Sequence, residues 1–486
     1  MDNRNLKVNS LLNTVKTLMS LIFPLITFPY VSRILLPENI GKVNFGLSVV
    51  GYFSLLATLG ITTYAIRECA GVRNNQDELN RIASQIFSIN VCTTLFAYIC
   101  LFVLLYFSAT LKSYRELILI QSIVMFFTVI GTDWINTAME DFFYITIRTI
   151  AVQIISLCLM FVFVHTPDDY IKYAMIMVFS TSGANILNAF YVRKYCHIKF
   201  VFNMEWRKHF KEIMSLFVML VAQIIFSNAD VTMLGFMRGD YEVGLYSTAY
   251  KVTYIVSQIV SSLAWVMMPR LSAYFAEENY FQINELLRKI LGIFMLVGIP
   301  CTIGLMMLSR ETVLIVGGKA YEDAACSLIF LIGAFFFSLV GGSFLGNMVL
   351  LPSKRENVYM VICVVACLFK LLSNYWFIPY GGLNAAAFTT MLSSVLIMVL
   401  LLYTKDRRIV IRNIGSLVKS PCIGGIMIAL FCWCLKNTSF GLFHMTALSV
   451  FGSVCIYTVC VLFMKNEVAE ELIEMMRQKI LRYRHE

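Results

Sequence analysis

Long apolar runs separated by short polar segments fill almost the whole chain. Each run holds roughly 20 residues, the length at which a helix rising about 1.5 Å per residue crosses the hydrocarbon core of a bilayer. The pattern predicts an all-α, polytopic membrane protein with about fourteen transmembrane helices. We expect these spans at about 11–34, 42–65, 82–107, 117–138, 143–164, 171–192, 213–237, 243–269, 290–308, 324–350, 358–378, 383–403, 418–435 and 441–464.

The second apolar run has a counterpart later in the chain. Gly41 opens this run and Arg67 follows its end, and 203 positions later Gly244 opens another run that Arg270 follows. Such an offset is far longer than the period of a solenoid and indicates two bundles of equal helix number and the same orientation. We therefore expect two pseudo-symmetric, seven-helix-like lobes around a central cavity.

Two amphipathic stretches suggest where the lobes begin and end. The first stretch has Trp206 and Phe210 among basic residues. The second has apolar residues at helical spacing: Val468, Leu472, Met475, Met476 and Leu481. Each pattern is typical of a helix on a membrane surface. The predicted division is 1–199 for an N-terminal lobe (spans 1–6), 200–212 for an interfacial linker, 213–404 for a C-terminal lobe (spans 7–12), 405–464 for spans 13–14 and 465–486 for a cytoplasmic amphipathic tail.

Composition and charge agree with this topology. The chain is 59% hydrophobic and 14% charged, whereas soluble domains carry about 25% charged residues. With a cytoplasmic N-terminus, 26 Lys and Arg residues fall on the inner side, 9 on the outer side and 4 within spans. The positive-inside bias thus predicts two cytoplasmic termini. The net charge of +10 is then a topology signal and implies no nucleic-acid partner.

The motifs of covalent catalysis and metal binding are missing from the sequence. Gly317-Gly318-Lys319 is followed by Ala320, so no phosphate-binding loop for ATP is present. The 5 histidines are scattered, and most of the 14 cysteines lie inside apolar runs, where they act as small hydrophobic residues. We expect a protein that is not an enzyme and holds no cofactor or metal, with coupling to Na⁺ or H⁺ left open.

Charged residues at membrane depth are costly and usually face a cavity or a partner. Asp133 and Arg148 are expected at matching depths near the inner side, as a structural pair. Asp230, Lys370 and Asn374 are expected at a common depth nearer the outer side, as an ion-coupling site or latch. A static neutralised pair is the alternative interpretation for Asp230 and Lys370.

The remaining candidate site residues are cations. Lys and Arg bind phosphate oxygens well, Arg with a bidentate grip. No acidic partner is expected at the depth of Lys16, Arg33 and Lys251, which favours a path for an anionic substrate. For the arginines at the span ends, ordinary positive-inside residues are the alternative. The candidates are Lys16, Arg33, Arg67, Lys251 and Arg270.

Several motifs make the chain resemble the bacterial polysaccharide flippases, the O-antigen and capsule repeat-unit exporters of the multidrug/oligosaccharidyl-lipid/polysaccharide (MATE-like) superfamily. The run from Pro29 to Gly41 and the pattern Arg67-Glu68-x-Ala70-x-x-Arg73 are similar to the opening of that family. Asp133-Trp134, followed by Glu140-Asp141 and by Arg148, resembles a second stretch of it.

The resemblance implies a flippase that moves undecaprenyl-pyrophosphate-linked oligosaccharide repeat units from the cytoplasmic to the outer leaflet of the bacterial inner membrane by alternating access. Membrane lipid and other polysaccharide assembly proteins are the implied partners. Lys16, Arg67 and Arg270 would receive the pyrophosphate, and Arg33 and Lys251 would hold it before release. Some relatives place a sodium site where Asp230, Asn374 and Thr390 stand here, but Lys370 is expected close enough to occupy it.

Two other classes stay open. A MATE-like multidrug or cation antiporter would favour an acidic cavity, yet the charges inside the spans are 4 cations against Asp133 and Asp230. A membrane-embedded polysaccharide polymerase or ligase would be expected to carry a large outer loop, and the longest here is the short segment from Ser309 to Asp323. The excess of cations favours an anionic substrate, and the short outer loops favour a transporter over an enzyme.

Overall fold

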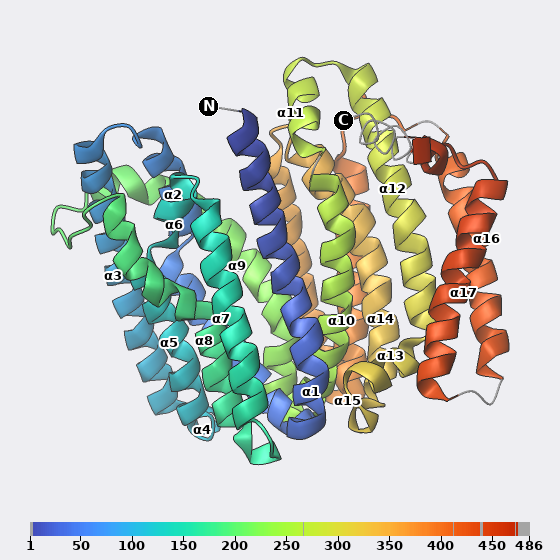
Figure 1. Ribbon diagram of the computed structural model, residues 1–486, viewed down its shortest axis with the longest axis horizontal. Helices are drawn as coiled ribbons and strands as arrows, with labels where there is room; N and C mark the ends of the chain where they lie inside the picture. The colour runs from blue at the N-terminus through green and yellow to red at the C-terminus, as the bar shows by residue number, and fades with distance from the viewer. Residues whose placement is uncertain (1–2, 266, 412, 438–440, 472, 475–486) are drawn as a thin grey trace. The chain divides into compact units, whose positions relative to one another are not determined.

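The computed structural model describes residues 3–474 except 266, 412, 438–440 and 472, and the described chain is helical with no strand (Figure 1). The elements are α1 (Asn3–Thr58), α2 (Ile61–Gly71), α3 (Gln76–Phe107), α4 (Ala109–Lys112), α5 (Arg115–Gly131), α6 (Asp133–Ala138), α7 (Phe142–Phe163), η1 (Pro167–Asp169), α8 (Tyr170–Tyr191), η2 (Val192–Lys194), α9 (Trp206–Met237), α10 (Asp240–Trp265), α11 (Met268–Ala276), α12 (Tyr280–Met307), α13 (Ser309–Val316), η3 (Lys319–Tyr321), α14 (Ala324–Ser338), η4 (Leu339–Leu350), α15 (Glu356–Thr404), α16 (Ile414–Lys436) and α17 (Leu442–Phe463).

Each predicted span overlaps a helix or one half of a kinked helix. Ten helical segments of the described chain are long and apolar enough to cross a membrane. Two of them, in α1 and α15, each merge two predicted spans across a residue with non-helical dihedral angles, Leu36 (φ 61°) and Gly382 (φ 53°). The all-helical fold is therefore confirmed, whereas the count of fourteen spans stays a prediction.

Some predicted spans are not continuous helices. The span at 117–138 breaks at Thr132, whose φ of 43° separates α5 from α6. The span at 42–65 ends early, because α1 stops at Thr58 and α2 begins at Ile61 after Gly60, with φ 76°. A hydropathy pattern does not register either break, because it records residue polarity and not backbone dihedral angles.

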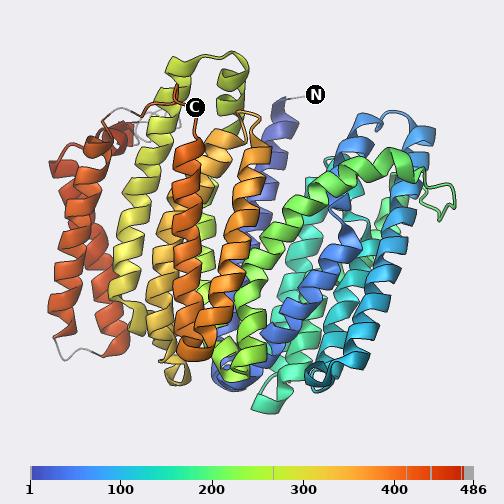
Figure 2. The same ribbon diagram turned by 180° about the vertical axis from the view of Figure 1, so that it is seen from behind.

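The contacts within the chain define two compact units, Met1–Gly244 and Leu245–Glu486. In the first unit α1 packs against α3, α5, α7 and α9. Figure 2 shows α9 alongside the second half of α1. There, Tyr52 and Thr232 share a hydrogen bond of 3.1 Å and Thr232 donates one to Ser48 at 3.0 Å. Packing thus groups α9 with the first unit, whereas the sequence pattern placed it in the second lobe; the lobe boundaries stay a prediction.

The predicted linker at 200–212 holds no separate helix, because residues 197–205 are irregular and Trp206 already begins α9. The segment lies along α3, where Asn80, Ser84 and Ser88 accept hydrogen bonds from the backbone N–H groups of every second residue: His197 (2.8 Å), Lys199 (3.1 Å) and Val201 (2.8 Å). Four residues of helix rise about 6.0 Å and two residues of extended chain about 6.6 Å, so the two spacings match.

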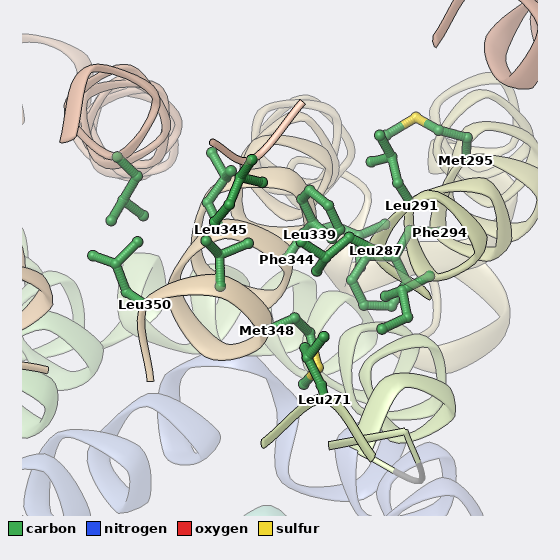
Figure 3. Packing of buried hydrophobic residues seen from close by; sticks show 14 of the residues in the cluster. Leu271, Leu287, Leu291, Phe294, Met295, Leu339, Phe344, Leu345, Met348 and Leu350 are labelled. Carbon is green, nitrogen blue, oxygen red and sulfur yellow. The ribbon is translucent and has the colours of Figure 1, made fainter. Parts of the chain in front are cut away.

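The second unit is organised around α12, α14, η4 and α15. Leu287 and Phe294 of α12 lie in one core with Leu339 and Phe344 of the π-helical η4, and the rings of Phe294 and Phe344 meet edge to face at 6.5 Å (Figure 3). These side chains come from segments that are more than 40 residues apart, so the core fixes how α12 and η4 pack.

The beginning of the predicted tail docks on the second unit. Glu467 and Glu471 form ion pairs with Arg288 and Lys289 of α12, both at 2.5 Å, and Val468 is buried. Asn466 donates a hydrogen bond to Ser420 of α16 at 2.7 Å. Leu472, Met475, Met476 and Leu481, part of the predicted amphipathic pattern, lie outside the described residues.

Candidate functional site

A group of charged side chains lies inside the first unit, between α1, α6 and α7. We call Lys16, Asp133 and Arg148 the cationic cluster. The Arg148 side chain is only 3% exposed and forms an ion pair with the Asp133 carboxylate, whose side chain is 42% exposed. Arg148 also donates a hydrogen bond to the carbonyl of Ala184 at 3.2 Å. The two residues predicted as a structural pair are therefore in direct contact.

The break between α5 and α6 determines the position of Asp133. Because Thr132 adopts a left-handed conformation, α5 ends at Gly131 and Asp133 begins α6. A buried hydrogen-bond chain holds the break: Asn136 donates to the side chain of Asn188, which donates to the carbonyl of Gly131. Irregular backbone at membrane depth is tolerated where side chains satisfy its polar groups or where it lines a cavity. The asparagines supply that satisfaction here.

The sequence interpretation missed both of these asparagines. Asn136 and Asn188 are each 0% exposed, and the only signal available was the presence of an amide within an apolar run. Such a signal does not say which carbonyl the amide will meet.

The charges of the cationic cluster do not balance. Lys16 is half-buried on α1 and close enough to Arg148 to be repelled by it electrostatically. Within the part of the chain that the structure describes, Lys16 forms no ion pair and Nε of Arg148 has no hydrogen-bond acceptor. Two cations against one carboxylate leave a net positive charge at membrane depth. Such an excess of positive charge attracts an anion.

Aromatic side chains support the N-terminal end of α7. The ring of Tyr144 lies 5.2 Å from the Arg148 guanidinium and stacks at 3.5 Å on Tyr191. Asp141 accepts hydrogen bonds from the hydroxyls of Tyr191 (2.8 Å) and Tyr195 (2.6 Å). Partial burial would raise the pKa of the Asp141 carboxyl, but these hydrogen bonds outweigh it and hold that pKa below its usual value. A charged Asp141 thus anchors Tyr191, which stacks on Tyr144, the ring that contacts Arg148.

Arg67, which the sequence predicts to receive the pyrophosphate, already has acidic partners. Its guanidinium pairs with Glu212 of α9 and with Glu68 at 3.6 Å, and it lies 5.6 Å from the Tyr64 ring. Tyr64 in turn shares a hydrogen bond of 2.6 Å with the buried His209. The carboxylate of Glu212 comes from a helix 145 residues away in sequence, so the pattern around Arg67 did not reveal it.

The other predicted substrate residues lie on separate elements. Arg33 is exposed on α1 and Arg270 is exposed on α11, whereas Lys251 is half-buried on α10. Arg33 and Lys251 each make an interaction of their own. Their placement alone assigns no binding partner, and their roles stay predictions.

The predicted coupling residues are buried. Asp230 is 1% exposed in the first unit, and Lys370 and Asn374 are 2% and 0% exposed in the second. The amide oxygen of Asn374 accepts a hydrogen bond from Thr389, a residue that the sequence interpretation did not single out. The ion-coupling or latch role of Asp230, Lys370 and Asn374 stays a prediction.

The helical fold has close counterparts among solved structures. The chain superposes on a lipid II flippase MurJ in an inward closed conformation with a TM-score of 0.70, at 16% identity, covering 94% of this chain and 99% of that one. An inward-facing multidrug resistance MATE family transporter of the MOP superfamily gives a TM-score of 0.62 at 14% identity, with coverages of 78% and 92%. The protein therefore has the MATE-like fold of multi-pass membrane transporters.

Comparison of the sequence with known proteins assigns the chain to a family. The family described as polysaccharide biosynthesis protein matches residues 6–275, more than half of the chain, and the chain belongs to that family. A putative O-antigen transporter of Shigella dysenteriae is 24% identical over 78% of this chain and 95% of its own length. The capsular polysaccharide biosynthesis protein CapF of Staphylococcus aureus is 25% identical, with coverages of 81% and 97%. The family resemblance found in the motifs is confirmed.

Proposed function

We propose that this protein is a flippase that moves a lipid-linked oligosaccharide from the inner to the outer leaflet of the bacterial cytoplasmic membrane. Family membership and relatives described as O-antigen and capsule proteins support a transporter, not an enzyme. The carrier lipid is undecaprenyl pyrophosphate, and both termini face the cytoplasm, in line with the positive-inside bias. Other polysaccharide assembly proteins are the partners that would supply and receive the glycan.

The cationic cluster is the observation that carries the proposal. A pyrophosphate is an anion with several acceptor oxygens, and the cluster offers it an ammonium and a guanidinium in a setting where water screens charge weakly. The ion pair with Asp133 keeps Arg148 compensated in the empty protein, and the entering phosphate competes with Asp133 for the guanidinium. The lipid tail stays in the bilayer while the polar head group crosses.

The cations outside the cluster take successive positions on this path. Arg67 is paired with Glu212 and receives the head group at the inner side together with Arg270. Arg33 and Lys251 hold it before release. The positive cluster also disfavours the rival function of multidrug antiport, because an organic cation would be repelled where a phosphate is attracted.

The experiment compares charge variants in a host that lacks its own flippase and accumulates lipid-linked oligosaccharide. Removing one charge-assisted contact costs about 1.5–3 kcal/mol, so Lys16→Gln should slow export of surface polysaccharide by roughly tenfold or more. Lys172→Gln is the matched control, because Lys172 is exposed and pairs with Asp169 instead of contacting the cluster.

Arg148→Gln alone would leave Asp133 without its partner and could impair folding. The double variant Arg148→Gln with Asp133→Asn removes both charges of the ion pair, so the net charge of the pair stays zero. We expect this variant to fold but not to export polysaccharide. If the double variant accumulates in the membrane at the wild-type level and exports polysaccharide at the wild-type rate, the cluster has no phosphate role and the proposed mechanism fails.

Coupling is tested separately at the predicted latch. Export is measured in sodium-free buffer and at two values of pH, with the wild type and with Asp230→Asn. A rate that depends on Na⁺ or on pH in the wild type but not in Asp230→Asn assigns coupling to this carboxylate. Rates that stay equal under all conditions rule it out.

A further inference from the structure

A polar cavity lies at the opposite end of the first unit from the cationic cluster. Its volume is about 330 Å³, within the range of pockets that hold small ligands. It is formed where α4 meets α5, at the start of α8 and at the start of α10. The positive-inside bias predicts that this end faces the outside. The polar and aromatic residues that line it are Lys42, Ser113, Tyr114, Glu116, Tyr170 and Asp240.

Fixed contacts hold the walls of this cavity. The hydroxyl of Tyr114 lies within hydrogen-bond distance of both carboxylate oxygens of Asp240, at 2.8 and 2.9 Å. The ammonium of Lys42 lies 5.6 Å from the ring of Tyr170 and pairs with Glu38 at 3.2 Å. Two tyrosine rings and a carboxylate are therefore pre-positioned, which lowers the entropy cost of binding a ligand.

The charge of the cavity argues against phosphate. Asp240 and Glu116 line it and Glu38 stands beside it, with Lys42 as the only cation among the lining residues. Burial raises the pKa of Asp240, yet nearby carboxylates still outnumber the ammonium. An anionic head group would be repelled here, and an acyl chain would leave the carboxylates without hydrogen-bond partners.

The available hydrogen-bonding groups suit a hydroxylated ligand. Glu116 is exposed and forms no ion pair with the residues that the structure describes, so both of its oxygens can accept hydrogen bonds. Asp240 keeps further acceptor positions besides the one that Tyr114 fills. A sugar ring offers several hydroxyl donors around its edge and apolar C–H faces that can lie on a tyrosine ring. Carboxylates beside aromatic rings provide both kinds of contact.

We infer that the cavity lined by Tyr114, Tyr170 and Asp240 is a saccharide subsite that holds part of the glycan on the outer side of the protein. The inference rests on the proposed flippase function and extends it, because it assigns the sugar to a site separate from the one that binds phosphate. The cationic cluster recognises the charge common to all such carriers, whereas this subsite recognises the glycan itself.

The test uses the purified full-length protein and oligosaccharide repeat units cut from the surface polysaccharide of the producing strain, free of lipid and phosphate. Binding is measured by saturation-transfer difference NMR. The wild type should bind these units, and Asp240→Asn and Tyr170→Ala should each weaken binding by about tenfold or more. Asp77→Asn, which changes an exposed carboxylate on α3 instead, should bind like the wild type.

The outcomes separate this inference from the flippase proposal. The double variant Arg148→Gln with Asp133→Asn should lose export but still bind the phosphate-free units. If that variant exports normally while Asp240→Asn loses glycan binding, the subsite stands and the phosphate mechanism falls. The subsite is refuted if the units do not bind the wild type, if Asp240→Asn and Tyr170→Ala bind them unchanged, or if inorganic pyrophosphate displaces them.

Discussion

Gly41 and Gly244 mark the predicted internal repeat, and each lies against the backbone of the other's copy of that repeat. A Cβ atom added at Gly41 would run into the backbone carbonyl of Asp240, and one added at Gly244 would run into the carbonyl of Pro37. The offset of 203 that relates the two glycines also relates Pro37 to Asp240. The crossing is thus reciprocal, and each glycine allows close approach to the other's repeat.

Gly41→Ala tests this crossing. A backbone carbonyl cannot rotate away as a flexible side chain can, so the two helices must separate, at a cost of about 1–3 kcal/mol for overpacking. Gly304→Ala is the matched control, because Gly304 lies within α12 and a Cβ atom there meets nothing within 4 Å. Both changes gain the same helix propensity of about 0.5–1 kcal/mol. The difference between them therefore measures the clash.

The assay is thermal unfolding of the purified protein in detergent, followed by tryptophan fluorescence. Gly41→Ala should unfold at a lower temperature than Gly304→Ala, and Gly244→Ala should behave like Gly41→Ala. The double variant Gly41→Ala with Gly244→Ala should lose less than the sum of the two single losses, because the first substitution already parts the helices. Equal midpoints for Gly41→Ala and Gly304→Ala, or strict additivity in the double variant, would refute the crossing.

Two further predictions concern the loops. Hydrogen bonds from Arg408 hold the pKa of Asp406 below its usual value, so the ion pair stabilises the fold above the unfolded pKa and is lost as the pH falls through the folded pKa. Asp406→Asn should lower the free energy of unfolding at pH 7 by less than about 1 kcal/mol, which shows as a slightly lower midpoint of thermal unfolding. The difference in midpoint between the variant and the wild type should shrink below about pH 4. A difference that is independent of pH contradicts the pairing. Ser84→Ala removes the acceptor for the Lys199 amide and should speed its hydrogen exchange by roughly tenfold, whereas unchanged exchange would show that the contact does not hold the segment.

Local physical rules made much of the fold predictable. A run of apolar residues that crosses a bilayer must satisfy its backbone hydrogen bonds internally, so hydropathy alone predicts a helix and its approximate ends. The break at Thr132 escaped this rule, because hydropathy records whether a segment is apolar and not its backbone dihedral angles. The contacts that stabilise the break come from Asn188, more than 50 residues away.

The candidate site was predictable in part. Charges inside apolar runs identified Lys16, Asp133 and Arg148, because a charge at membrane depth is costly without a role or a partner. The sequence did not reveal that Arg67 pairs with Glu212, nor that Tyr114 lies against Asp240. Each of these contacts joins residues more than 100 positions apart, and no local pattern encodes such a distance.

The sequence by itself determined the helical class and the family and predicted the repeat that relates Gly41 to Gly244, since these depend on residue type and spacing along the chain. Only the tertiary structure decided which cations keep a carboxylate partner and which polar side chains share a cavity. The physical reason is that electrostatic and hydrogen-bond energies depend on distances in space, and these are fixed only when distant helices pack together.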